Sequence, residues 1–462
     1  MKEISQLSSR LLSPRLLSPW LQKWFAQSTL VTLAVTSVFT SAIALSFVSP
    51  AKASLEDSPK VIVDEVWQIV NSEFVGRDFD REEWQEVRQD LLDREYTSND
   101  EAYRTIRKAL RDLGDPYTRF LNPNEFAQLT TQTTGELSGI GVRLQLDGTG
   151  SALEIVELVD ESPAAEAGIQ EGDRILSIDS QTTALMKLEQ AVELLRGEEG
   201  SDVTLKLTRP NKGLFEVTLT RAPVEVPVLH YSLREENEMR VGYMYLEEFS
   251  SHAAEQMQRA IAKLQERDVD GFVLDLRGNP GGLLFSSVDI ARMWMETGAI
   301  VRTVDRLGGD REYSADRTSL TELPLVVLVD EYSASASEIL AGALKDNGRA
   351  TLIGNRTYGK GTVQSVHSLS DDSGLAVTIS RYYPPSGINI NNNGIAPDIE
   401  VSLTQEQKRL LRGNPAARGS QRDPHYTRAL NVLQERFARE DSPATPPAPV
   451  SIRQLIEEEV QE

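Results

Sequence analysis

Three serines occur at alternate positions where an apolar segment runs into a helical one. The segment is "LVVLVDEYSASASEILAGALKD", and the serines are Ser333, Ser335 and Ser337. A serine at a strand-to-helix turn is exposed at the edge of a sheet, where the N-terminus of the helix favours developing negative charge. One of these serines can therefore act as a nucleophile. The competing interpretation is that they are N-cap residues, which is a common use of serine.

A glycine-rich loop follows a second apolar segment. In "GFVLDLRGNPGGLL", a strand is predicted over Phe272–Leu276, and the loop after it contains Gly278, Asn279, Pro280, Gly281 and Gly282. A loop of this kind can aim backbone N–H groups at an oxyanion. The alternative is a tight turn that needs positive φ, for which glycine is the usual residue.

A lysine between two glycines offers a third element of chemistry. The stretch "GNRTYGKGT" resembles a phosphate-binding loop in Gly354, Gly359 and Lys360, but Gly361 stands where that loop needs a hydroxyl for magnesium. A neutral lysine can instead activate a serine as its general base. This use requires a lysine pKa that is lower by roughly three units, or about 4 kcal/mol, which burial can supply. Gln364 could orient the amine.

Composition excludes several other classes of protein. The 462 residues carry a net charge of -22, which argues against nucleic-acid binding because phosphate contacts need clustered lysine and arginine. The chain has no cysteine, so disulfides, thiol nucleophiles and thiolate metal sites are excluded. Its four histidines are scattered and show no zinc-binding spacing. We therefore expect no cofactor and no metal.

The first 53 residues predict export. Basic residues precede the apolar run "LVTLAVTSVFTSAIALSFV", and Ala51-Lys52-Ala53 has the small-x-small pattern of a cleavage site. An uncleaved membrane anchor is the alternative. In both cases the rest of the chain is exported, to the thylakoid lumen or the periplasm. Exported compartments generally lack ATP, which weakens the nucleotide-binding interpretation of Lys360.

Two further regions position these residues. From Val241 to Ser402, strand-like and helix-like segments alternate, which predicts an α/β domain with a largely parallel sheet. From Gly135 to about Ala222, short β-rich runs surround "SPAAEAGIQEGDRILSID", and this region resembles a PDZ domain. Such a domain captures a peptide carboxylate on backbone N–H groups and pairs the peptide with a strand. The matching carboxylate loop is Ser138, Gly139, Ile140, Gly141 and Val142. An all-β module without a ligand is the alternative.

The motifs together resemble the carboxyl-terminal processing peptidases, which are PDZ-containing serine proteases with a Ser/Lys dyad. The resemblance is carried by "SASASE", "YGKGTVQ", "DLRGNPGG" and "GIAPDIEV", and it covers the chain from about Pro59 to Leu403. "DPYTRFLNP" and "TTGELSGIGV" indicate the cyanobacterial and chloroplast branch. One departure is Gly278, where many members have asparagine.

The resemblance implies a role for each matching residue. The nucleophile is the middle serine, Ser335, and the general base is Lys360 with Gln364 in support. The oxyanion donors are the backbone N–H groups of Gly281 and Ala336. In some relatives an arginine at the position of Arg196 couples the PDZ domain to the active site. The alternative for Arg196 is a solvated residue at a helix end.

The implied fold is a multidomain α+β protein with an α/β core like those of crotonase and Clp protease. The expected divisions are a signal peptide, a helical region, a PDZ domain, a serine peptidase domain and a helical, low-complexity tail, over residues 1–53, 54–130, 131–223, 224–403 and 404–462. We expect no chemistry from the helical region or the tail.

The expected function is that of an exported serine endopeptidase that removes C-terminal extensions from precursor or tagged proteins. The photosystem II reaction-centre precursor is one such substrate suggested by the resemblance. The expected partners are proteins or peptides with a free C-terminus, with no nucleic acid and no nucleotide, and any peripheral membrane association would come through substrates. The alternative is a non-catalytic PDZ scaffold or peptide-binding chaperone.

Overall fold

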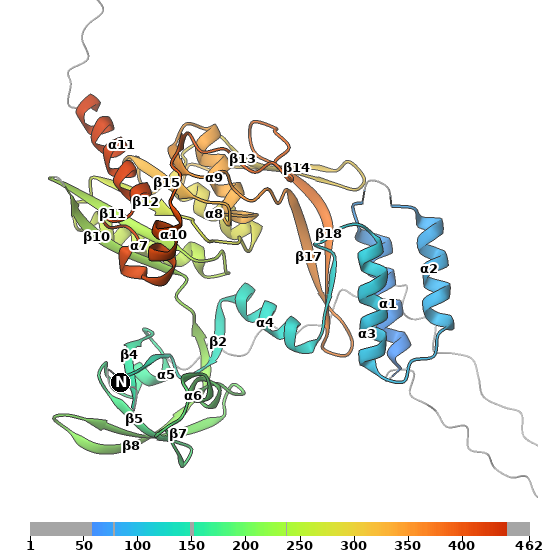
Figure 1. Cartoon of the computed structure of the whole chain (residues 1–462), viewed down its shortest axis with the longest axis horizontal. Coiled ribbons are helices and arrows are strands. Elements are labelled where there is room, and N and C mark those ends of the chain that lie inside the picture. Colours follow the sequence, from blue (N-terminus) through green and yellow to red (C-terminus); the bar gives the residue numbers. More distant parts are fainter. Residues whose placement is uncertain (1–57, 77–78, 148–151, 237, 441–462) are drawn as a thin grey trace, which may run out of the picture. The chain divides into compact units, whose positions relative to one another are not determined.

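A computed structural model describes residues 58–76, 79–147, 152–236 and 238–440 (Figure 1). The predicted signal peptide lies outside the described residues. Within them, none of the helices is long and apolar enough to cross a membrane.

Three helices form the N-terminal part of the described chain. They are α1 (Pro59–Glu73), α2 (Arg81–Asp93) and α3 (Asn99–Asp112). Each begins at a serine or aspartate whose side chain accepts a backbone N–H, and each contributes an apolar face to one shared core. The helical region predicted from the sequence is therefore present. The chain then forms β1 (Arg119–Leu121) and α4 (Pro123–Thr134).

The PDZ-like domain is built on one antiparallel sheet. The strand order is β3-β4-β5-β7-β8, with the short β6 beside β5. The elements are β3 (Val142–Leu146), β4 (Leu153–Leu158), α5 (Pro163–Glu166), β5 (Arg174–Ile178), β6 (Gln181–Thr182), α6 (Leu188–Leu195), β7 (Asp202–Arg209) and β8 (Gly213–Thr220). Alternate strand residues and α6 share one apolar core. The chain enters this domain through β2 (Glu136–Gly139) and leaves through β9 (Ala222–Glu225), which pair with each other.

The second half of the chain contains a six-stranded sheet in the order β10-β11-β12-β15-β16-β19. Its strands are β10 (Leu229–Glu236), β11 (Met239–Leu246), β12 (Gly271–Asp275), β15 (Leu325–Val329), β16 (Ala350–Gly354) and β19 (Ile399–Glu400). Only the β10–β11 pair is antiparallel. Every residue of β12 and β15 is buried, as expected for central strands that are covered on both faces. The prediction of a largely parallel sheet is confirmed.

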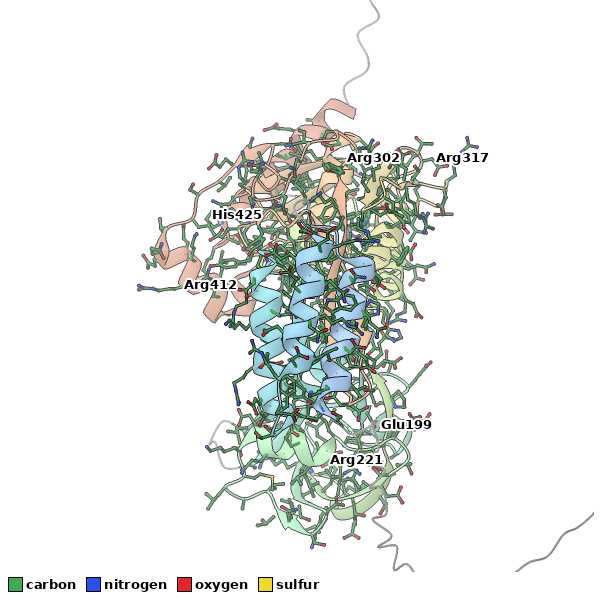
Figure 2. All side chains as sticks on the ribbon, turned by 90° about the vertical axis from the view of Figure 1, so that its right-hand side faces the viewer. Glu199, Arg221, Arg302, Arg317, Arg412 and His425 are labelled. Atoms are coloured by element: carbon green, nitrogen blue, oxygen red, sulfur yellow. The ribbon has the colours of Figure 1, made fainter. Side chains whose placement is uncertain are left out.

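Helices cover both faces of this sheet. The connections contribute α7 (Ala253–Gln265), α8 (Leu284–Trp294) and α9 (Ala336–Asp346), which share one apolar core with the sheet. The tail contributes α10 (Gln405–Gly413) and α11 (Pro424–Glu440), and α11 packs on the other face. Figure 2 shows Arg412 of α10 extending from the ribbon, whereas His425 of α11 is buried.

A second sheet joins the N-terminal helices to the second half of the chain. It contains β13 (Ala299–Asp305), β14 (Asp310–Ser314), β17 (Thr362–Ser368) and β18 (Gly374–Tyr383), and β1 pairs with β18. Leu375 and Val377 of β18 belong to the same apolar core as the three helices. The turn between α3 and β1 is held to β18 by the hydrogen bond from the Thr378 hydroxyl to Asp115, and the neighbouring β17 begins two residues after Lys360.

Candidate active site

Ser335 occupies the turn between β15 and α9. Its backbone has φ 53° and ψ -114°, a combination that costs a non-glycine residue about 1–3 kcal/mol and that recurs at functional turns. The residue is partly accessible, and α9 begins at the next position. The strained turn therefore presents the Ser335 side chain at the N-terminus of a helix, where negative charge is favoured.

The two flanking serines are structural. Ser333 and Ser337 are fully buried, and both hydroxyls donate to the glycine-rich loop: Ser333 Oγ to Leu276 O at 2.9 Å, and Ser337 Oγ to Asn279 O at 3.0 Å. They fasten that loop to the serine turn, and neither is an N-cap. The N-cap of α9 is Ser335, but its hydroxyl does not cap the helix.

The glycine-rich loop lies directly against Ser335. A Cβ atom on Gly281 would stand 2.7 Å from Ser335 Cβ and 2.9 Å from Ala336 N, and φ at this glycine is 105°. Only glycine allows this approach, and it places the Gly281 backbone against the Ala336 N–H group. In the structure the Gly281 N–H donates to Asn279 Oδ1 at 2.8 Å, so an oxyanion would have to replace this acceptor.

Glu338 was not singled out from the sequence, although it lies in the same turn. Its carboxylate is fully buried and accepts four hydrogen bonds. The donors are Ser335 N (2.9 Å), Thr357 Oγ1 (2.6 Å), Gly359 N (2.7 Å) and Lys360 N (2.9 Å). Burial raises the pKa of Glu338, and these hydrogen bonds oppose that shift. One carboxylate thus ties the serine turn to the loop that carries the lysine.

Lys360 is half-buried and faces the same cavity as Ser335. Its Nζ lies 4.9 Å from the centre of the Tyr117 ring, and within the described residues it makes no hydrogen bond to Ser335. Burial lowers the pKa of Lys360, and the nearby Arg119 lowers it further, against the opposing charges of Asp115 and Glu338. The direction is the one that a lysine base requires.

A cavity of about 850 Å³ brings these residues together. Ser335, Lys360 and Gln364 all line it, as do Tyr117 and Gly282. The Gln364 amide donates to the hydroxyls of Thr362 (2.9 Å) and Thr378 (3.3 Å) rather than to Lys360. The predicted support of the lysine by Gln364 therefore stays a prediction. The N-terminal helical region, from which no chemistry was expected, contributes Tyr117 to the lining of this cavity.

Comparison with known proteins identifies the family. A family model described as "Peptidase family S41" matches residues 240–401, and one described as "PDZ domain" matches residues 154–209. A carboxyl-terminal-processing protease of Picosynechococcus sp. is 41% identical over 372 residues, which cover 80% of this chain and 88% of that protein. The chain belongs to peptidase family S41.

Two further relatives have similar coverage. A carboxyl-terminal-processing protease of Synechocystis sp. is 38% identical over 352 residues, which cover 76% of this chain and 82% of that protein. The chloroplastic carboxyl-terminal-processing peptidase 3 of Arabidopsis thaliana is 37% identical over 352 residues, which cover 73% of this chain and 68% of that protein. The chain is accordingly a serine-type endopeptidase with a PDZ domain.

A buried ion-pair cluster holds Arg277, the residue directly before the glycine-rich loop of this peptidase. Arg277 donates to Asp275 of β12 and, through both terminal nitrogens, to Asp423 beside α11 (2.9 and 2.6 Å). His425 Nε2 lies 2.7 Å from Val401 O. A carbonyl oxygen only accepts, so Nε2 carries the proton and Nδ1 accepts from Arg277. Burial lowers the pKa of His425, with Arg277 as the second cause. The tail is thus part of the structure that holds the loop.

The PDZ domain of the peptidase has a groove of about 400 Å³ at the predicted loop. All five predicted residues, Ser138, Gly139, Ile140, Gly141 and Val142, line it. Ser138 and Gly139 belong to β2 and pair with β9, which leaves Ile140 and Gly141 between two strands. Arg196 follows α6, is exposed and lines the same groove. Its coupling to the active site stays a prediction.

Proposed function

We propose that this S41 peptidase removes C-terminal extensions from proteins by means of a Ser335–Lys360 dyad. The observation that carries the proposal is that the strained turn of Ser335 and the half-buried Lys360 face one cavity, in a chain that also has a PDZ domain with an open groove. The groove suits a free C-terminus, and the cavity suits the scissile bond.

The chemistry follows from the geometry. Neutral Lys360 accepts the proton of Ser335 Oγ while Oγ bonds to the scissile carbonyl carbon, and the carbonyl electron pair moves to its oxygen. The N–H groups of Gly281 and Ala336 stabilise that oxyanion once Gly281 N–H has left Asn279 Oδ1. The lysine ammonium then gives its proton to the leaving amine, and water hydrolyses the acyl-serine ester.

The proposed location is the thylakoid lumen or the periplasm. This rests on the signal pattern of residues 1–53 and on relatives whose names include the word chloroplastic. The proposed partners are proteins with a free C-terminus, and membrane association would come through those substrates. The photosystem II reaction-centre precursor is the first substrate to test.

Covalent labelling and product mapping test the proposal together. The full chain is incubated with a fluorophosphonate, and separately with a protein that carries a C-terminal extension, and mass spectrometry identifies the labelled residue and the cleaved bond. We expect the label on Ser335 and cleavage near the C-terminus, both insensitive to a metal chelator. A label on Ser333 or Ser337 would contradict the choice of nucleophile. Binding of the extension without cleavage would favour the scaffold function.

Arg196→Ala tests the coupling between the PDZ domain and the dyad. If the arginine couples them, the variant lowers kcat on a full-length precursor by about 5-fold or more and leaves the Kd for a C-terminal peptide unchanged. Fluorescence anisotropy measures the Kd, and cleavage assays measure kcat. A weaker Kd with unchanged kcat would assign Arg196 to the peptide groove instead, and no change in either would leave it a surface charge.

A further inference from the structure

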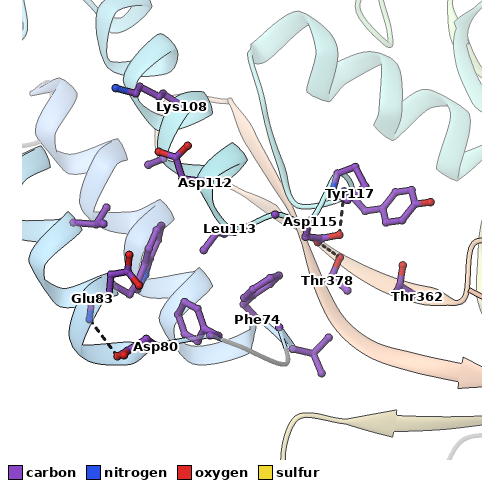
Figure 3. Close-up of a pocket in the computed structure, with 18 of the residues that line it drawn as sticks. Phe74, Asp80, Glu83, Lys108, Asp112, Leu113, Asp115, Tyr117, Thr362 and Thr378 are labelled. Carbon is purple, nitrogen blue, oxygen red and sulfur yellow. Dashed lines mark hydrogen bonds between the residues drawn. The ribbon is translucent and has the colours of Figure 1, made fainter. Parts of the chain in front are cut away.

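The turn between α3 and β1 is anchored at the active site by one carboxylate. Asp115 Oδ2 accepts from the backbone N–H and the hydroxyl of Thr118 (3.0 and 2.6 Å) and from the hydroxyl of Thr378 (2.6 Å). Its other oxygen accepts from Tyr117 N at 3.3 Å. Figure 3 shows Tyr117 and Asp115 on this turn beside Thr378 and Thr362. The backbone of Tyr117 is therefore held in place relative to β18.

The face of the Tyr117 ring lies over the Lys360 amine. Nζ lies 4.9 Å from the ring centre, and within the described residues it has no hydrogen bond or ion pair. Burial, together with the neighbouring Tyr358, raises the pKa of Tyr117 to about 12. The ring is therefore neutral over the range in which a peptidase is assayed.

The other charged groups near Lys360 are Asp115 and Glu338, which favour the ammonium form, and Arg119, which disfavours it. Both carboxylates already accept hydrogen bonds from backbone and hydroxyl groups, and neither forms an ion pair with Nζ. Burial of an unpaired ammonium is unfavourable, so a group that stabilises it at short range has a large influence on when it forms.

We propose that Tyr117 is a positioning residue for the general base, whose ring face holds the Lys360 amine and stabilises the ammonium that forms when Ser335 Oγ–H transfers its proton. This rests on the proposed dyad. In that step the O–H bond breaks, the Nζ–H bond and the bond from Oγ to the carbonyl carbon form, and the ring itself does not react. A cation–π contact of this type changes a proton affinity by about 2- to 30-fold, or about 0.4 to 1.5 pH units.

The test replaces Tyr117 in the full chain by phenylalanine and by phenylalanines with increasing fluorination, which keep the ring's shape while weakening its negative face. Tyr117→Leu removes the face altogether. As the face weakens, the ammonium is destabilised, so the pKa of Lys360 falls and the rising limb of kcat/KM moves to lower pH. The plateau of kcat falls at the same time. We expect a shift of about 0.4 to 1.5 units for Tyr117→Leu, a graded shift along the fluorinated series and no shift for Tyr117→Phe.

Two measurements keep the outcome clear. Carbon-13 NMR of labelled lysine titrates Lys360 directly, with Lys360→Arg for assignment, and so reads the contact even if the chain cleaves no substrate. Tyr332→Leu is the matched control, because Arg412 stacks on that exposed ring outside the cavity. Activity lost equally at every pH, without a shift of the lysine titration, would overturn the proposal. So would an equal shift for phenylalanine and its fluorinated forms.

Discussion

Ser335→Ala and Lys360→Arg are each expected to lower kcat/KM by about 10⁴-fold or more while the chain stays folded and binds C-terminal peptides. The alanine has no nucleophile. The arginine keeps the positive charge and can still stack on Tyr117, but a guanidinium does not lose its proton in the assay range. The two residues act in one step, so the double variant is expected to be no worse than either single one.

Single-turnover cleavage with purified variants measures this loss, and anisotropy with a C-terminal peptide measures binding. Lys212→Arg is a matched control, because Lys212 also lies over an aromatic ring, at 4.1 Å from Phe215, but in the PDZ domain and outside the cavity. It is expected to keep full activity. Substantial activity in Lys360→Arg would show that another group accepts the proton and would remove the dyad from the mechanism.

The sequence predicted the strands and helices whose apolar pattern lies within one short segment. The alternation of apolar and helical segments after Val241 corresponds to the parallel strands and their crossover helices, because each unit buries its own apolar face. The pairing of β1 with β18 has no such local signal. It joins Phe120 to Leu375, which are far apart in the sequence, and it holds the turn that carries Tyr117 at the cavity of Ser335 and Lys360.

The site residues also divide into those with a local sequence signal and those placed by long-range packing. Ser335, Lys360 and the glycine-rich loop stand in short motifs whose chemistry is visible in one stretch of sequence. Glu338 had a partial signal, since Ser335 and Glu338 have the spacing of a capping box, and its carboxylate does accept from Ser335 N. Its bonds to residues 357–360 depend on tertiary packing. Tyr117 stands in the motif "DPYTRFLNP", but neither its place at Lys360 nor that of Asp423 at Arg277 had a local signal, because each contact joins residues that are distant in sequence.

Glu338→Gln is expected to lower kcat by about 10²-fold with little change in KM. Glu338 Oε1 accepts from Thr357 and Gly359, and Oε2 accepts from the N–H groups of Ser335 and Lys360. A glutamine of the same shape has one oxygen, so its NH₂ must face two donors on one side. The turn and the lysine loop then separate, and a small displacement of the nucleophile or the base is costly. Each buried donor left without an acceptor also destabilises the fold by about 1–3 kcal/mol.

The loss of activity and the loss of stability can be separated. Steady-state kinetics below the unfolding transition give kcat and KM, urea unfolding gives the free energy of unfolding, and the rate of fluorophosphonate labelling reports the reactivity of Ser335 without a substrate. Glu331→Gln is the matched control, because Glu331 lies at the start of the same turn but bonds Lys408 near the surface. It is expected to cost at most about 1 kcal/mol and to leave kcat unchanged. If Glu338→Gln loses stability but labels Ser335 at the wild-type rate, the carboxylate is a structural anchor and does not position the dyad.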